Sequence, residues 1–191
     1  QVARWSPAII PIMSRPPAWR REGKAMSNPG FLQRVWPDMC AAYRDAALGR
    51  ACLDLQERYN VDVPLLLVLC IADRVGHGIA AENLDALVIE SEDWRAAAIE
   101  PLRRARQAMK GRFTAPSELA LRDDIKRLEL EAERLHVQRL AEAFPTAGGE
   151  GSMAASQYLA LRGVPTDTAT QFLQTFDIAY DAQVAPVVAL D

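Results

Sequence analysis

The 191-residue sequence lacks the sequence motifs by which many enzyme families are recognised, and it has few histidines and cysteines. It has only two histidines, His77 and His136, and its three cysteines, Cys40, Cys52 and Cys70, show no CxxC spacing, which argues against a zinc site. The motifs GxSxG, GxGxxG, GxxxxGK and HExxH are all absent. We therefore predict no catalytic residue, no metal and no cofactor. Whether the protein is an enzyme stays open, with a non-catalytic role favoured.

A hydrophobic run long enough to cross a membrane is also missing. The longest uninterrupted apolar stretch, residues 65–72, lies between Asp62 and Asp73. Crossing the hydrocarbon core of a bilayer takes about 20 apolar residues in a helix. The stretch therefore predicts the central helix of a water-soluble core. Together with buried, unpaired thiols it favours the reducing cytoplasm and no membrane association.

Most of the chain carries more negative than positive charge. The formal charge is −3, with 25 acidic and 22 basic residues. Residues 1–25 carry five basic groups and one acidic group, so the remaining residues have a net charge of −7. Nucleic acids and anionic lipids are bound largely through Lys and Arg, so both are poor electrostatic matches to this acidic body.

The first 25 residues differ from the rest of the chain in composition. Pro7, Pro11, Pro16 and Pro17 preclude a regular helix there. We expect residues 1–29 to form a disordered basic leader, with two alternatives: an upstream-extended reading frame, or a basic arm that docks on a partner. We expect residues 30–191 to form the helical domain, with a flexible break at 145–152, where the sequence reads PTAGGEGS.

From Phe31 onward the apolar residues recur at helical spacing, and no stretch alternates with period two. The pattern predicts an all-α, single-domain irregular bundle of about six to eight helices around a central apolar helix at residues 64–76. Pro37 is expected in a first turn, Ser91 as an N-cap, and Pro101 at a kink or break. The first helix is expected to begin at Phe31 or at Pro37 and to end at Ala46. Further helices are expected at residues 51–59, 64–76, 81–89, 91–113, 117–144, 153–161 and 167–182.

The longest predicted helix carries an apolar stripe whose members alternate at four and three residues. We call this set the leucine stripe and predict that it packs inward; it comprises Leu121, Ile125, Leu128, Ala132 and Leu135. After Leu135 the apolar pattern shifts toward His136, Leu140 and Phe144. His136 borders the stripe and is interpreted as a partly buried polar residue at a helix interface. Asp73 and His77, four residues apart, could share a metal ion, but a third ligand is not evident. The simpler interpretation is that the helix dipole favours His77 at the C-terminal end of its helix.

The segment PLRRARQAMKGR holds the densest positive charge outside the leader. Arg103 and Arg106 share a helix face, and guanidinium groups suit carboxylate or phosphate recognition. The simpler interpretation is a solvated face or pairing with the neighbouring acidic helix. The alternative is a docking surface for an acidic partner or an anionic ligand.

The chain resembles the uncharacterised bacterial family DUF2390. The resemblance rests on CLDLQERYNVDVPLLLVL, on Trp36 and Tyr43 before it, and on WRAAAIEPLRRARQAMK after it, and it covers roughly residues 31–161. Two positions depart from the family pattern: Pro64 stands where Asn is usual, and Cys70 where Trp is usual. The family implies a small cytoplasmic helical protein and supplies no activity, cofactor or catalytic residue.

Two functional hypotheses follow. The first is a non-catalytic interaction or regulatory module that binds a protein partner or forms a homodimer through an amphipathic helix. The second is a small-molecule-binding protein or enzyme with a pocket between helices, lined by Trp36, Tyr43, Gln56 and Arg103. We predict that Trp36, Tyr43, Gln56, Arg103 and Arg106 bind the ligand or the partner.

Overall fold

A computed structural model describes residues 29–77, 79, 81–142 and 153–184. These residues form helices and no strand, which confirms the predicted all-α class. The predicted leader and the predicted break at 145–152 lie outside the described residues, apart from Pro29. The elements are α2 (Pro29–Ala42), α3 (Ala46–Tyr59), α4 (Val63–Arg74), α5 (Ala81–Trp94), the π-helical segment η1 (Arg95–Ile99), α6 (Glu100–Met109), α7 (Pro116–Ala141), α8 (Ala154–Leu161) and α9 (Thr166–Gln183).

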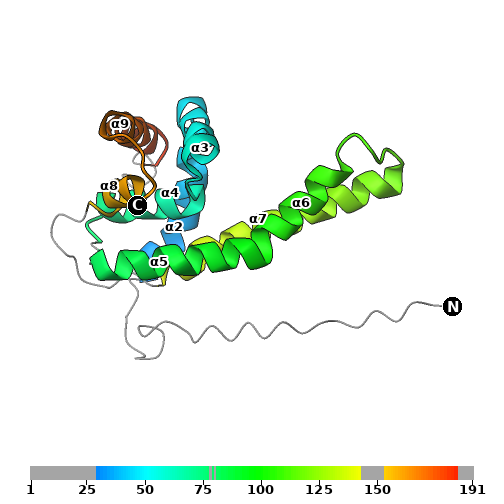
Figure 1. Cartoon of the computed structure of the whole chain (residues 1–191), viewed down its shortest axis with the longest axis horizontal. Coiled ribbons are helices and arrows are strands. Elements are labelled where there is room, and N and C mark those ends of the chain that lie inside the picture. The colour runs from blue at the N-terminus through cyan, green and yellow to red at the C-terminus, as the bar shows by residue number, and fades with distance from the viewer. Residues whose placement is uncertain (1–28, 78, 80, 143–152, 185–191) are drawn as a thin grey trace.

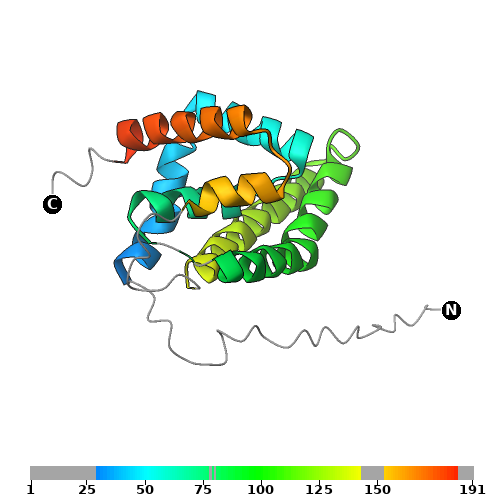
Figure 2. The same ribbon diagram turned by 60° about the vertical axis from the view of Figure 1, so that its left-hand side comes forward.

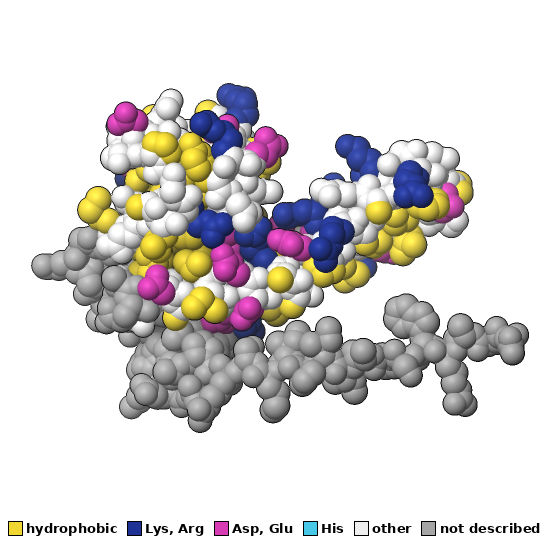
Figure 3. Space-filling view, in the orientation of Figure 1, with side chains coloured by type: hydrophobic (Ala, Val, Ile, Leu, Met, Phe, Trp, Pro, Cys, Tyr) yellow, Lys and Arg dark blue, Asp and Glu magenta, His cyan; other side chains and the backbone are white. Residues whose placement is uncertain are grey.

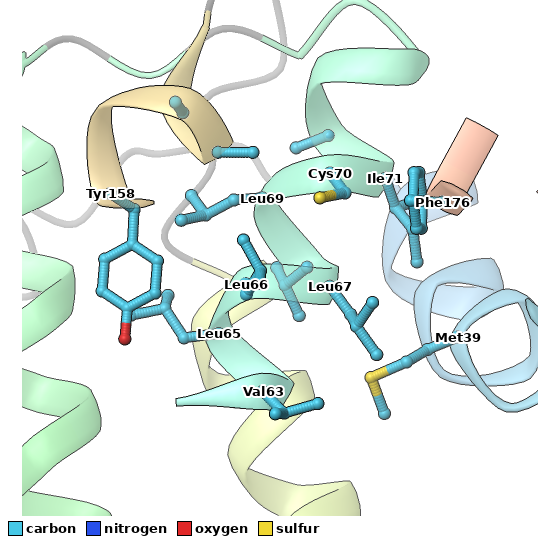
Figure 4. Close-up of a cluster of buried hydrophobic side chains, with 14 of the residues drawn as sticks. Met39, Val63, Leu65, Leu66, Leu67, Leu69, Cys70, Ile71, Tyr158 and Phe176 are labelled. Carbon is cyan, nitrogen blue, oxygen red and sulfur yellow. The ribbon is translucent and has the colours of Figure 1, made fainter. Parts of the chain in front are cut away.

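The apolar run forms α4 at the centre of the fold, as predicted. Asp62 caps the helix, and Pro64 occupies its first turn, where no N–H is needed. Side chains from Leu65 to Ile71 radiate on all sides of α4 and meet other helices, among them Tyr158 of α8 and Phe176 of α9 (Figure 4). Each fully buried leucine contributes about 1.5–3 kcal/mol of transfer free energy, so this helix is the main source of core stability.

The first two helices start earlier than the sequence indicated. Pro37 lies inside α2 rather than in its first turn. α3 begins at Ala46 because the Asp45 carboxylate accepts hydrogen bonds from the backbone N–H groups of Ala47 and Leu48, at 2.8 and 2.9 Å. It ends at Asn60, whose φ of 51° is the left-handed conformation of a helix C-terminus.

The predicted boundary at Ser91 is wrong. α5, η1 and α6 follow one another without a loop, and Ser91 is buried within α5 instead of capping a new helix. The irregularity expected at Pro101 is present as the π-helical turn immediately before it, which accommodates the missing N–H and the bulk of the proline ring. The Ser91 hydroxyl instead contacts the buried side chains of Asp62 and His136.

α6 and the first half of α7 form an antiparallel pair that projects from the body of the molecule (Figures 1 and 2). We call residues 100–130 the arm. No residue of α6 is buried, and in α7 the buried residues other than Glu129 all lie from Ala132 onward, where the helix packs on α2 and α4. Among the described elements, α6 is the one that lies along the outer half of α7.

The prediction that the whole leucine stripe packs inward is wrong. Leu121, Leu128 and Leu135 are 54%, 48% and 37% exposed, whereas Ala132 is buried. The body contacts α7 through Val137, Leu140 and Ala141, which lie on a different face of the helix. Hydrophobic side chains accordingly gather along one edge of the arm in the space-filling view (Figure 3).

Within the described residues, none of the helices combines the length and the apolar character that crossing a membrane requires.

Candidate functional site

A cluster of buried polar side chains lies where α4, α5, α7 and α8 meet. We call Asp62, Ser91, His136 and Tyr158 the polar junction; each is at most 3% exposed. Asp62 is fixed by its role as N-cap of α4, with Oδ1 accepting from the Leu65 N–H at 3.3 Å. Its own N–H donates to the Tyr158 hydroxyl at 2.9 Å, which ties α8 to the start of α4.

Ser91 links the acid to the imidazole in this junction. Its Oγ contacts Oδ2 of Asp62 and lies 3.0 Å from Nε2 of His136. A hydroxyl has one hydrogen, and a carboxylate can only accept, so Ser91 donates to Asp62 and accepts from the Nε2–H of His136. His136 is therefore the Nε2–H tautomer, and no described group lies within hydrogen-bonding reach of its Nδ1.

The three residue types of a serine hydrolase are present, but their order is different. In a hydrolase the histidine stands between the acid and the serine and removes the serine proton. Here the serine stands between the acid and the histidine, and its side chain is fully buried. The arrangement holds four helices together and does not present a nucleophile.

Burial sets the protonation of the junction. It lowers the pKa of His136, and the nearby charges of Arg95 and Arg139 lower it further, while Asp62 opposes them. Burial and the Asp62 carboxylate raise the pKa of Tyr158 to about 12. At neutral pH His136 and Tyr158 are therefore uncharged.

Arg95 lies on the first turn of η1 and is incompletely paired. Its side chain is 14% exposed, its Nε is 3.9 Å from Oδ2 of Asp62, and its Nη2 is 3.5 Å from Oε1 of Glu100. The first distance is too long for a hydrogen bond, and the second is at the limit. A mostly buried guanidinium with five N–H donors thus retains donors that no described carboxylate satisfies.

A second polar cluster connects α6 to α7 at the base of the arm. Arg103 donates to Glu129 and Glu133 at 3.0 and 2.9 Å, and Arg106 donates to Glu129 at 2.5 Å. Burial raises the pKa of Glu129, but the hydrogen bonds from Arg106 and Arg103 outweigh burial, so the net shift is downward. Burial raises the pKa of Glu133 and exceeds the opposing effect of Arg103.

A small cavity separates the two clusters. Its volume is about 20 Å³, so it admits only a group of a few atoms. The polar groups on its wall come from α3, α4, η1, α6 and α7, and the apolar wall comes from the start of α4 and from η1. The lining residues are Gln56, Val61, Asp62, Val63, Pro64, Arg95, Ile99, Arg103 and Glu133.

The residues predicted from the sequence as a binding site are only partly brought together. Gln56 and Arg103 line the cavity. Tyr43 is 42% exposed and does not line it, although burial, Cys52, Glu133 and Arg103 all affect its pKa, with a net upward shift. Trp36 packs against the hydrophobic core, and Arg106 lies farther out on the arm, against Glu129.

The junction residues were not predicted to form a site. Asp62 precedes a helical proline and Ser91 precedes two acidic residues, so both carry the local signature of a helix cap. Nothing local shows that His136, 45 residues after Ser91, lies against it. Asp73, considered above with His77 for a metal, instead caps α8 by accepting from the N–H groups of Ala154 and Ala155, at 3.1 and 2.9 Å.

The fold and site define an all-helical protein with a buried polar junction, a small polar cavity and a projecting two-helix arm. A family model described as "Protein of unknown function (DUF2390)" matches residues 34–140, more than half of the chain, and the protein belongs to this family. The matched segment includes Asp62, Ser91, His136 and the whole arm. No curated protein and no solved structure matches the chain.

Proposed function

We propose that the protein is a non-catalytic interaction module that binds a helix of another protein through the leucine stripe. The observation that supports it is the exposure of Leu121 and Leu128 on a projecting helix. Positions 121, 125, 128, 132 and 135 are separated by four and three residues, the spacing of coiled-coil core positions. A docked helix would bury leucines that no described element of this chain covers.

The charges beside the stripe favour a different protein over a second copy. Asp124 and Glu131 occupy the coiled-coil positions that flank the stripe on the side away from α6. In an antiparallel contact between two copies these acids would face one another, and like charges across such a contact destabilise it. Asp124 and Glu131 form exposed ion pairs with Arg127 and Arg134, and such pairs are weak. A Lys or Arg at the flanking positions of a partner helix could therefore pair with these two acids instead.

The proposal places the protein in the bacterial cytoplasm. It is supported by three cysteines that are all free, two of them buried, as expected in a reducing compartment. Arg103 and Arg106 serve the interaction indirectly in this proposal, because their bonds to Glu129 fix the angle between α6 and α7.

The test compares two double variants, each of which replaces two apolar side chains that are about half exposed or more. Leu121→Gln with Leu128→Gln changes the stripe, while Leu53→Gln with Ile178→Gln changes residues of α3 and α9 that are 50% and 71% exposed. Each variant is isolated under native conditions from cells that produce the protein naturally, and wild-type protein alone is sedimented.

We expect the wild type and the Leu53/Ile178 variant to retain the same stoichiometric partner, and the stripe variant to lose it. Partner recovery by the stripe variant at the wild-type level would contradict the proposal. If sedimentation shows that the wild type is a dimer and the stripe variant a monomer, the stripe binds a second copy of this chain and not a different protein.

A small-molecule-binding function is the second candidate. It is favoured by one observation, the placement of Gln56 and Arg103 on the wall of the same cavity.

A further inference from the structure

The cavity at the base of the arm offers hydrogen-bonding groups of both kinds. Arg95 supplies N–H donors that its two described carboxylate neighbours leave largely unused, at 3.5 and 3.9 Å. The amide of Gln56 makes no side-chain hydrogen bond to another described residue and can donate and accept. Of the two oxygens of Glu133, only Oε1 receives a hydrogen bond from a described group, Arg103.

The formal charges on the wall balance. Arg95 and Arg103 contribute two positive charges, and Asp62 and Glu133 contribute two negative charges. An anion in the cavity would be repelled by both carboxylates, and a cation would be repelled by both guanidinium groups. Because this wall is largely removed from water, repulsion between like charges is weakly screened there and is costly. A neutral group that both accepts and donates meets neither repulsion.

The size and the apolar part of the wall restrict the ligand further. A volume of about 20 Å³ admits only the small polar group at the end of a ligand. Val63, Pro64 and Ile99 form the apolar wall, against which the carbon atoms next to that end would pack. Pro64 adds no backbone N–H to the site.

We propose that this cavity binds the carboxamide group of a small molecule, with the carbonyl oxygen accepting from Arg95 and the NH₂ group donating to Glu133. Gln56 supplies a further hydrogen bond to either end of the group. The proposal rests on the second candidate function and is independent of the leucine stripe.

The experiment uses three molecules of nearly the same shape and different charge: acetamide, acetate and acetamidinium. Each is titrated into the full chain while NMR records the side-chain NH₂ signals of Gln56 and the Nε–H signal of Arg95. We expect acetamide to shift both signals saturably, with a Kd on the order of 1–10 mM, because so few atoms can make only weak contacts. Acetate and acetamidinium should bind at least about tenfold more weakly.

Three variants separate the proposed contacts. Arg95→Gln should weaken acetamide binding at least about tenfold, and Arg104→Gln, an exposed arginine of α6 that does not line the cavity, should leave it unchanged. Glu133→Gln should keep acetamide binding and strengthen acetate binding at least about tenfold, because one negative charge is gone.

Two results would overturn the proposal. The first is binding of acetate or acetamidinium to the wild type as tightly as acetamide. The second is the absence of saturable acetamide shifts at Gln56 and Arg95. If Arg95→Gln fails to fold, the three probes on the wild type and on Glu133→Gln still decide. The Leu121/Leu128 variant should bind acetamide normally, so failure here is distinct from failure of the interaction proposal.

Discussion

Removal of the Ser91 hydroxyl should cost far more stability than an ordinary serine substitution. Ser91→Ala deletes one hydrogen bond to the Asp62 carboxylate and one to His136, and both partners are at most 3% exposed. A hydrogen bond to a charged group contributes about 1.5–3 kcal/mol and a neutral one about 0.5–1.5 kcal/mol. We therefore expect the free energy of unfolding to fall by about 2–4.5 kcal/mol. This is a large share of the 5–15 kcal/mol that is usual for a domain.

Urea unfolding followed by circular dichroism measures this loss. With a slope near 2 kcal/mol per molar, the midpoint should fall by about 1–2 M. Thr175→Ala is the matched control, because that hydroxyl donates to the Gln171 carbonyl at 2.8 Å on the exposed surface, and its loss should cost under about 0.5 kcal/mol.

A double variant tests whether the effect belongs to the junction. Ser91→Ala combined with His136→Phe should cost less than the sum of the two single changes, because the histidine that loses its partner is also gone. If Ser91→Ala unfolds within about 0.5 kcal/mol of the wild type, the hydroxyl does not link Asp62 to His136.

Three further predictions follow. Because burial lowers the folded-state pKa of His136, the unfolded chain takes up a proton first as pH falls below about 6.5. Relative to His136→Gln, the wild type should therefore lose up to about 1.4 kcal/mol of stability per pH unit below that value, in urea titrations at pH 7.5 and 5.5. A constant difference would contradict the assignment. Glu129→Ala should increase hydrogen exchange throughout α6, since Arg103 and Arg106 lose their shared acceptor, whereas Glu131→Ala on the exposed side should not. Native alkylation at pH 8 should modify Cys40 alone, because Cys52 and Cys70 are buried and burial raises the pKa of Cys52 to about 12; mass spectrometry showing Cys70 modified at the same rate would refute this.

The helical class and the central helix could be predicted because they depend on local pattern. Residues 65–72 are apolar on every side, so the element they form must be buried all round, and Asp62 and Pro64 before them suit the N-cap and first turn of a helix. Pro101 likewise indicated an irregular turn, because the missing N–H acts on its own helix wherever that helix lies.

The candidate sites depended on contacts between distant segments. Ser91 had the local signature of a cap and became the buried link between Asp62 and His136, 29 residues before it and 45 residues after it. The leucine stripe had the pattern of a core helix, yet its outer half extends past the helices that would cover it.

The sequence by itself determined which segments are helical and which face of each is apolar, because hydrogen bonding within a helix and side-chain periodicity are local properties. Only the tertiary structure decided which apolar faces are covered and which polar side chains meet. Those outcomes depend on the lengths and crossing positions of helices that are far apart in the chain, and no short stretch of residues encodes them.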